Sequence, residues 1–239
     1  MTQPPLTHAP HIFVDDLDTL ELDPADDHHL RVLRIQPGTA VVACDGRGGW
    51  RSCRRTATAI EADGPATISE PAAPRIAIAF ALTKGDKPEL VVQKLTELGV
   101  DRIVPFRAAR SVVQWDAARA AKAGDRLRAV ARAATMQCHR PWSPVVEEVQ
   151  DFAALVTRPG AALADRSGQP LGLGDALVLV GPEGGWAREE LDLARTRGVR
   201  RVAAAPHVLR AETASLTIGA LLSTLRAGLV APATSDPRE

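Results

Sequence analysis

A glycine-rich segment, Leu179-Val-Gly-Pro-Glu-Gly-Gly185, directly follows an apolar run and precedes a polar stretch that begins near Arg188. Glycine allows positive φ angles and lets a ligand approach the backbone closely. In parallel α/β folds, ligands bind at the carboxyl ends of the strands. The segment matches neither the dinucleotide fingerprint G-x-G-x-x-G nor the phosphate-binding P-loop. It therefore predicts a ligand-binding loop of another kind, with a plain tight turn as the alternative.

A second segment, Pro206-His-Val-Leu-Arg-Ala-Glu-Thr-Ala-Ser215, follows the next expected strand and leads into the last expected helix. Glu212 and Thr213 suit a helix start, where an acid meets the positive end of the helix dipole. Arg210 is the only Lys or Arg between positions 201 and 226, so it is placed to meet a phosphate or a developing negative charge. The alternative is a helix cap with a solvated arginine. Because the two segments follow consecutive strands, we expect them to meet at one sheet edge.

A third segment, residues 82–99, combines lysines and acids after another expected strand. Lys84 follows the strand, and Lys94 lies on the helix after it. Gln93 and Glu97 are one helical turn apart, so their side chains can interact. An ordinary solvent-facing helix explains most of these side chains, and we favour it over catalysis.

Metal and nucleophile chemistry find little support in the sequence. His28 and His29 lie beside Asp26 and Asp27, but adjacent histidines on one helix do not converge on one ion. No second ligand set has zinc spacing, so we expect no metal. The chain lacks the G-x-S-x-G turn that holds a nucleophilic serine, which disfavours a protease or an esterase.

Two kinds of fold are expected to position these segments. Residues 1–72 predict a small barrel or sandwich, because short β-rich runs alternate with glycine turns. Its expected strands are 11–14, 39–44, 50–60 and 66–69, with a helix over 24–33. From 75 to 230, apolar strands alternate with amphipathic helices, which predicts a parallel sheet covered on both faces. The expected strands are 76–82, 102–105, 161–164, 176–180 and 200–204, and the expected helices are 88–98, 117–138 (which Gly124 could break), 188–197 and 213–228. We expect the polar tail, 231–239, to be disordered.

Composition narrows the class of protein. The chain has 239 residues, of which 45% are hydrophobic and 24% charged, as in ordinary globular proteins. Its three cysteines suit a reducing compartment better than a disulfide framework. No apolar run approaches the roughly 20 residues that span a bilayer, and no secretory signal begins the chain. These features predict a cytoplasmic protein with no membrane partner.

Charge is balanced overall but uneven along the chain. Residues 15–27 are acidic, whereas 31–55 and 102–140 are rich in arginine. Basic stretches suit a polyanion such as RNA. They equally suit solvated helix faces, and composition alone leaves both interpretations open.

Several motifs stand together in the order of one known family: Lys84-Gly85, Lys94-Leu-Thr-Glu97-Leu-Gly99, Arg110-Ser-Val-Val113, Gly181-Pro-Glu-Gly-Gly185 and Leu209-Arg-Ala-Glu-Thr213. His29-Leu-Arg-Val-Leu-Arg34 and Asp45-Gly46 match its N-terminal domain. The chain thus resembles the RsmE-type methyltransferases of the SPOUT class, which methylate N3 of a uridine in 16S ribosomal RNA. The resemblance spans nearly the whole chain.

The resemblance implies a PUA-like β-barrel that helps to bind RNA, followed by an α/β domain threaded through a trefoil knot. The knot is a rare exception to unknotted topology. S-adenosyl-L-methionine is expected to lie in the knot, held largely by the backbone of the two loops. The implied cofactor residues are Leu163, Gly181, Pro182, Glu183, Gly184, Gly185, Val208, Leu209, Arg210, Glu212, Thr213 and Ala214.

The resemblance also gives the basic stretches a purpose. A methyl sulfonium is already a good electrophile, so the protein must mainly place uracil N3 in line with the methyl group. We expect Arg210 to stabilise the N3 anion or to hold the target phosphate, and Glu212 to order its loop. The implied RNA contacts are Arg31, Arg34, Arg54, Arg55, Lys84, Lys94, Arg110, Arg132 and Arg140. The implied assembly is a homodimer acting on 16S rRNA within the 30S subunit.

Two departures from the family pattern stand in this chain. Met136-Gln137 replaces the usual Glu-Gln, and Ala204-Ala205-Pro206 replaces Leu-Gly-Pro. The alternatives are a SPOUT enzyme on another RNA, a ribosome-assembly factor that binds RNA without turnover, and a generic nucleotide-binding protein. The β-rich N-terminal part disfavours the first, and the missing phosphate fingerprints disfavour the last.

Overall fold

The computed structural model describes residues 9–32, 34–113 and 115–231. The chain forms two compact units. Unit 1 combines Met1–Ala72 with Arg132–Ser143, and unit 2 combines Ala73–Ala131 with Pro144–Glu239. Arg132–Ser143 belongs to unit 1 although it lies far from residues 1–72 in the sequence, and no sequence pattern predicted this. Leu33 and most of the tail expected to be disordered (232–239) lie outside the described residues.

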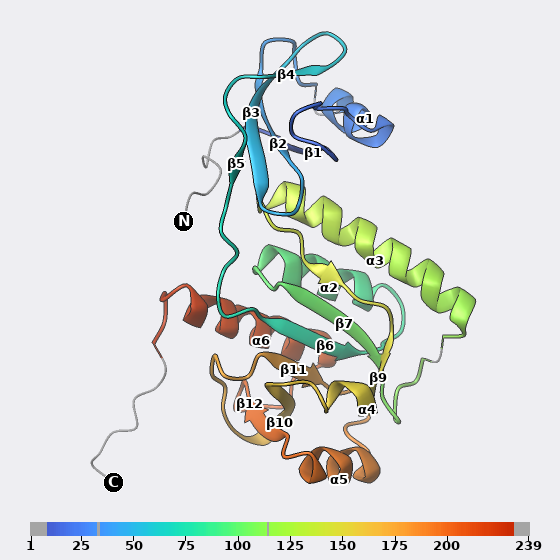
Figure 1. The fold of residues 1–239 in the computed structure, drawn as a ribbon. Coiled ribbons are helices and arrows are strands. Elements are labelled where there is room, and N and C mark those ends of the chain that lie inside the picture. The colour runs from blue at the N-terminus through green and yellow to red at the C-terminus, as the bar shows by residue number, and fades with distance from the viewer. Residues whose placement is uncertain (1–8, 33, 114, 232–239) are drawn as a thin grey trace. The chain divides into compact units, whose positions relative to one another are not determined.

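Unit 1 is built on a five-stranded sheet with strand order β1-β2-β3-β4, and β5 pairs with β3 (Figure 1). β1 and β2 are parallel, and the other pairs are antiparallel. Ile12, Leu30 and Val41 are fully buried in its core. The elements are β1 (His11–Phe13), α1 (Pro24–Val32), β2 (Ala40–Cys44), β3 (Gly49–Arg55), β4 (Ile60–Ala62) and β5 (Thr67–Ile68).

The prediction of one strand over residues 50–60 is wrong. Two strands, β3 and β4, occupy this region and form a hairpin. The chain turns because Thr56 Oγ1 bonds the backbone of Ala59 in both directions, donating to its carbonyl and accepting from its N–H. A threonine hydroxyl that bonds the nearby backbone in this way competes with strand pairing.

The returning segment, Arg132–Ser143, is fastened to unit 1 by polar contacts. The Trp142 indole N–H donates to the Ser69 carbonyl at 2.9 Å. The Arg132 guanidinium holds both carboxylate oxygens of Asp26, whose side chain is 1% exposed. It also lies 4.7 Å above the ring centre of Phe13. These contacts explain how the end of the long helix α3 (Ala117–Gln137) becomes part of unit 1.

His11 makes unit 1 sensitive to acid. Its ring is 4% exposed and stacks on His139 at 4.1 Å. Burial, and next the charge of His139, lowers the pKa of His11 from 6.5 to about 4. Between those pH values the unfolded chain binds a proton that the folded chain does not, so the stability present above pH 6.5 is lost on acidification.

We expect the free energy of unfolding of unit 1 to fall by about 2–3 kcal/mol between pH 7 and pH 4.5 because of this one group. Denaturant titration at both pH values measures the loss. His11→Phe keeps a flat ring but removes the titrating group. Over the same pH change, the free energy of unfolding of this variant should therefore fall by about 2–3 kcal/mol less than that of the unmodified protein. Carboxylates titrate in both proteins alike, and equal losses in the two would contradict the prediction.

Unit 2 is an α/β fold on a seven-stranded parallel sheet with strand order β12-β10-β11-β6-β7-β8, and β9 also pairs with β7. The strands are β6 (Ala77–Ala81), β7 (Arg102–Arg107), β8 (Val145–Val146), β9 (Gln150–Asp151), β10 (Ala161–Pro170), β11 (Leu177–Val180) and β12 (Arg200–Ala203). The other helices are α2 (Lys87–Glu97), α4 (Phe152–Leu155), α5 (Arg188–Thr196) and α6 (Ala211–Arg226).

Two hydrophobic clusters cover the two faces of this sheet. Alternate residues of β6 point to opposite sides, with Ile78 in one cluster and Ala79 in the other. α2, α3 and α6 contribute to the first cluster, and α4 and α5 to the second (Figure 1). The expected parallel sheet covered on both faces is confirmed.

Some details differ from the sequence prediction. α3 runs unbroken through Gly124, because Ala120, Leu127 and Ala131 on its buried face outweigh the cost of about 1 kcal/mol for one glycine. α6 begins at Ala211, two residues early, and β10 extends to Pro170. The short elements β8, β9 and α4 were not predicted. In the described residues, no helix is long and apolar enough to cross a membrane.

Candidate active site

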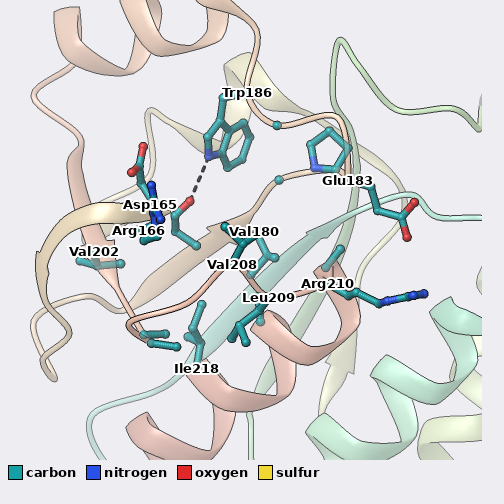
Figure 2. Close-up of a pocket in the computed structure, with 18 of the residues that line it drawn as sticks. Asp165, Arg166, Val180, Glu183, Trp186, Val202, Val208, Leu209, Arg210 and Ile218 are labelled. Atoms are coloured by element: carbon teal, nitrogen blue, oxygen red, sulfur yellow. Dashed lines mark hydrogen bonds between the residues drawn. The ribbon is translucent and has the colours of Figure 1, made fainter.

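The two motif loops meet at one edge of the unit 2 sheet. One follows β11, the other follows β12, and β10 lies between these strands. Because the strands are parallel, both loops leave from the same edge, as expected. Between them lies a cavity of about 630 Å³ (Figure 2). We call it the loop cavity. Its volume lies within the range of about 300–1,000 Å³ that is usual for small-molecule sites.

Most of the residues implied for the cofactor line this cavity. They are Gly181, Pro182, Glu183, Gly185, Val208, Leu209, Arg210 and Ala214. Four others do not line it. Leu163 is buried in the core beneath the sheet edge, and Thr213 is exposed on α6. Gly184 and Glu212 instead make contacts that hold the loops.

Gly184 and Glu212 connect the motif loops to the rest of unit 2. The Gly184 carbonyl accepts a hydrogen bond from Arg110 Nη1 at 3.2 Å. A side chain at Gly184 would first meet Arg110, with 3.4 Å between the two Cβ atoms. Glu212 Oε1 lies 3.4 Å from Lys87 Nζ, and its other oxygen is buried without a hydrogen-bond partner among the described residues.

Lys87 joins both loops at the first turn of α2. Its ammonium donates to Glu183 Oε1 and lies near Glu212, so one cation binds an acid from each loop. The hydrogen bond between them lowers the pKa of Glu183 and raises that of Lys87. Lys87 was not among the residues selected from the sequence, although it stands beside the Lys84-Gly85 motif.

Trp186 forms a wall of the cavity and was likewise not selected from the sequence. Its indole N–H donates to the Ala164 carbonyl at 3.0 Å, the dashed line in Figure 2. Its ring stacks on Phe106 at 6.1 Å. A Cβ added at Gly181 would come within 2.9 Å of this ring, so the glycine is needed for the loop to pass the indole. The feature of the sequence that could have identified Trp186 is its position directly after the glycine-rich segment.

A break in the β10–β12 ladder brings further polar groups to the cavity. The register shifts between Ala164 and Gln169, and Ala164, Asp165 and Arg166 line the cavity there. Burial alone would raise the pKa of Asp165, but hydrogen bonds from the Ser167 N–H and hydroxyl lower it. The site therefore holds an ionised carboxylate at its β10 side.

Arg210 lies at the mouth of the cavity as the residue before α6. Its backbone is extended, and its side chain points outward on the same side as Glu183 (Figure 2). Within the described part of the chain, no acid lies within 4 Å of its guanidinium. An arginine without an ion-pair partner beside a cavity can bind an anionic group of a substrate.

Comparisons with known proteins show the family to which the chain belongs. The RNA methyltransferase domain family matches residues 70–223, and the RNA methyltransferase PUA domain family matches residues 22–57. The ribosomal RNA small subunit methyltransferase E of Mycobacterium bovis is 32% identical over 219 residues, which are 81% of this chain and 82% of that protein. The chain belongs to this methyltransferase E family. The resemblance seen in the motifs is confirmed, and so is the fold class, a PUA domain followed by an α/β domain with a parallel sheet.

Other methyltransferase E proteins are similar over most of their length. The Bacillus subtilis protein is 28% identical over 228 residues, covering 85% of this chain and 89% of the relative. A crystal structure of the Neisseria gonorrhoeae protein bound to S-adenosyl methionine has a TM-score of 0.80 and 27% identity. That match covers 91% of this chain and 98% of the other.

In a methyltransferase E, basic side chains are candidate RNA contacts, and unit 1 holds six of those implied by the motifs. Arg31 pairs with Asp27, and Arg54 pairs with Asp63 at 2.6 Å, but both arginines remain exposed. Arg34 is also exposed, and Arg140 is half-buried. The exposed side chains of Arg31, Arg34 and Arg54 are accessible to a polyanion.

Arg55 and Arg132, also implied as RNA contacts, are both paired with acids of unit 1. The Arg55 side chain is 6% exposed and bonds Asp27 at 2.8 Å, whereas Arg132 holds the buried Asp26. Removing Arg132 would take this counter-charge from the buried Asp26, which is costly, whereas Asp27 would keep Arg31 if Arg55 were removed. Both arginines therefore contribute to the folding of unit 1, and their part in RNA binding stays a prediction.

The three candidates in unit 2 differ in their surroundings. Lys84 is exposed directly after β6. Lys94 is held by Glu97, one helical turn away on α2, with both oxygens within 2.9 Å. Arg110 reaches the Gly184 carbonyl and so borders the loop cavity. Lys84 and Arg110 are therefore the stronger candidates for RNA contacts, because Lys94 already forms an ion pair with Glu97 on its own helix.

Proposed function

We propose that this methyltransferase E transfers a methyl group from S-adenosyl-L-methionine to N3 of one uridine in 16S ribosomal RNA. The observation that supports it most is the loop cavity, which forms between the two motifs on which the resemblance to the family rests. We further propose that it acts as a cytoplasmic homodimer on RNA within the 30S subunit. The trefoil knot, and domain limits at residues 1–72 and 75–230, are part of the same proposal.

The residues of the loop cavity suit S-adenosyl-L-methionine. Val180, Leu209 and Ile218 offer apolar walls for the flat adenine and the ribose carbons, and Trp186 adds an aromatic one. Loop backbone groups and the Asp165 carboxylate offer hydrogen bonds at the edge. The bound cofactor would supply an electrophilic methyl group on a sulfonium.

The protein's own side chains have a limited task in this reaction. Uracil N3 must lose its proton before or while it accepts the methyl group, so negative charge develops on the ring. Arg210 lies at the cavity mouth and would stabilise that charge or hold the target phosphate. Lys87 would keep Glu183 and Glu212, and with them both loops, in place. We propose the four residues outside the cavity wall, Leu163, Gly184, Glu212 and Thr213, as support for the loops.

Methyl transfer from labelled S-adenosyl-L-methionine tests the function directly. The substrates are 30S subunits and protein-free 16S rRNA from a strain that lacks the gene, followed by digestion and mass spectrometry of the nucleosides. We expect 3-methyluridine at a single site, with 30S subunits as the better substrate. A different methylated nucleoside would overturn the target, and cofactor binding without transfer would favour an assembly factor.

Lys87→Met tests how the two loops are held. We expect the affinity for S-adenosyl-L-methionine to fall about 5–10-fold, because two acids lose their shared cation. The free energy of unfolding should change little, since the ion pairs are solvent-screened. Calorimetric titration and thermal unfolding measure the two effects. Lys94→Met removes a lysine from the same helix away from the cavity, and an equal loss of affinity there would contradict the assignment.

A further inference from the structure

A second cavity lies beside the loop cavity, and Lys84 is the one residue of its lining that the function described so far has used. Its volume is about 280 Å³. It is formed by the end of β6, the first turn of α2, the first half of α3 and the segment before α3. We call it the α2–α3 cleft. The side chains that matter for its chemistry are Thr83, Lys84, Trp115, Arg119, Lys122 and Arg126.

The cleft is strongly basic. Two lysines and two arginines line it, against one acid, Glu89. Glu89 is already paired with Arg126, at 2.9 Å. Lys84, Arg119 and Lys122 have no ion-pair partner among residues 9–32, 34–113 and 115–231, and all three are exposed. Cations gathered without acids around a concave surface attract an anion.

The cleft also offers an aromatic surface and an unused hydroxyl. Trp115 is half-buried in the wall, so part of its ring is open to the cleft. Thr83 Oγ1 is buried and has no hydrogen-bond partner in the described structure. Buried polar atoms are nearly always bonded, so this hydroxyl is available to a ligand. Cations together with an aromatic ring are the features that bind single-stranded nucleic acid, one for phosphate and the other for the base.

The cleft lies next to the loop cavity along the sheet edge. β6 and β11 are neighbouring parallel strands, with Phe80 paired to Val180, so Thr83 and Gly181 follow adjacent strand ends. The first turn of α2 serves both cavities: Lys87 binds Glu183 of the loop cavity, and Pro88 lines the cleft. The two cavities therefore lie along one edge of the sheet, where a single RNA strand can contact both.

We propose that the α2–α3 cleft binds a nucleotide that neighbours the methylated uridine, with its base against Trp115 and its phosphate among Lys84, Arg119 and Lys122. This inference rests on the proposed function, because it takes RNA as the substrate. Trp115, Arg119 and Lys122 become substrate-positioning residues, and Thr83 contributes a hydrogen bond to the base or the sugar.

The test uses the full-length protein and a uridine hexanucleotide as the probe. Arg119→Ala combined with Lys122→Ala removes two cleft cations. The matched control is Arg188→Ala combined with Arg195→Ala, which removes two exposed cations from α5 and changes the net charge equally. We expect the cleft pair to weaken hexanucleotide binding about 10-fold. The slope of log affinity against log salt should fall by about 0.7 for each phosphate that the protein no longer neutralises. The control pair should change neither the affinity for the hexanucleotide nor the salt slope.

A fluorescence measurement identifies the stacking side chain. The chain has four tryptophans, and we expect the hexanucleotide to quench the fluorescence of the unmodified protein. Trp115→Phe should remove most of that quenching while the other three tryptophans still emit. Trp115→Ala should weaken binding about 5–150-fold, which corresponds to the loss of about 1–3 kcal/mol of stacking with one base.

Two results would overturn the cleft as a nucleotide site: equal losses of affinity in the cleft pair and the control pair, or quenching that survives in Trp115→Phe. Affinity for S-adenosyl-L-methionine should stay within about two-fold in every variant, because none of the substituted side chains lines the loop cavity. If the cleft effects appear but no RNA is methylated, the methyltransferase proposal fails and the cleft stands.

Discussion

Arg210→Ala should lower the rate constant of methyl transfer about 100–1,000-fold while the affinity for S-adenosyl-L-methionine stays within about three-fold. The guanidinium lies at the mouth of the loop cavity and has no ion-pair partner within the residues that the structure describes. Removing one preorganised group that stabilises developing charge typically costs a factor of this size. Single-turnover transfer to 30S subunits and calorimetric titration of the cofactor measure the two quantities.

The form of the Arg210 effect distinguishes its two roles. If the guanidinium stabilises the uracil anion, kcat falls and the KM for RNA changes little. If it holds the target phosphate, the KM rises as well, and Arg210→Lys recovers part of the loss because a lysine also binds phosphate. Arg188→Ala, on the exposed start of α5, is the control and should leave both constants unchanged. Full turnover by Arg210→Ala would show that the residue does neither task.

Gly181→Val should weaken binding of S-adenosyl-L-methionine about 5–150-fold. A Cβ at this position would approach the Trp186 ring to 2.9 Å, and the two methyl groups of valine add to the conflict. Overpacking of this kind costs about 1–3 kcal/mol, and here it displaces a wall of the cavity together with its hydrogen bond to Ala164. Calorimetric titration of the cofactor gives the affinity.

A second glycine provides the control for Gly181. Gly172 follows β10, and a Cβ there would meet nothing within 4 Å, so Gly172→Val should bind the cofactor normally. Trp186→Leu in the Gly181→Val background should relieve the clash and restore part of the affinity. If Gly181→Val binds as tightly as the unmodified protein, Trp186 does not form the wall that we assign to it.

The sequence by itself determined the sheet, the loops and the family of this protein. Strand and helix periods are local properties: Ile78 and Ala79 face opposite sides because side chains alternate along any strand. The glycine motif and the Leu-Arg-Ala-Glu-Thr motif each follow a strand directly, and parallel strands end at one edge. Their meeting around a cavity was therefore predictable from order alone.

Only the tertiary structure decided which side chains complete the sites. Lys87 reaches Glu183 across 96 positions, and Arg132 reaches Asp26 across 106, and no local period records such pairs. For the same reason nothing in the sequence indicated that Arg55 pairs with Asp27, 28 positions away. The α2–α3 cleft joins β6, α2 and α3 in the same way: Arg119, Lys122 and Arg126 lie close together on α3, but only the fold brings Lys84 and Thr83 to them. Local sequence sets the elements, whereas pairing between distant charges depends on how those elements pack.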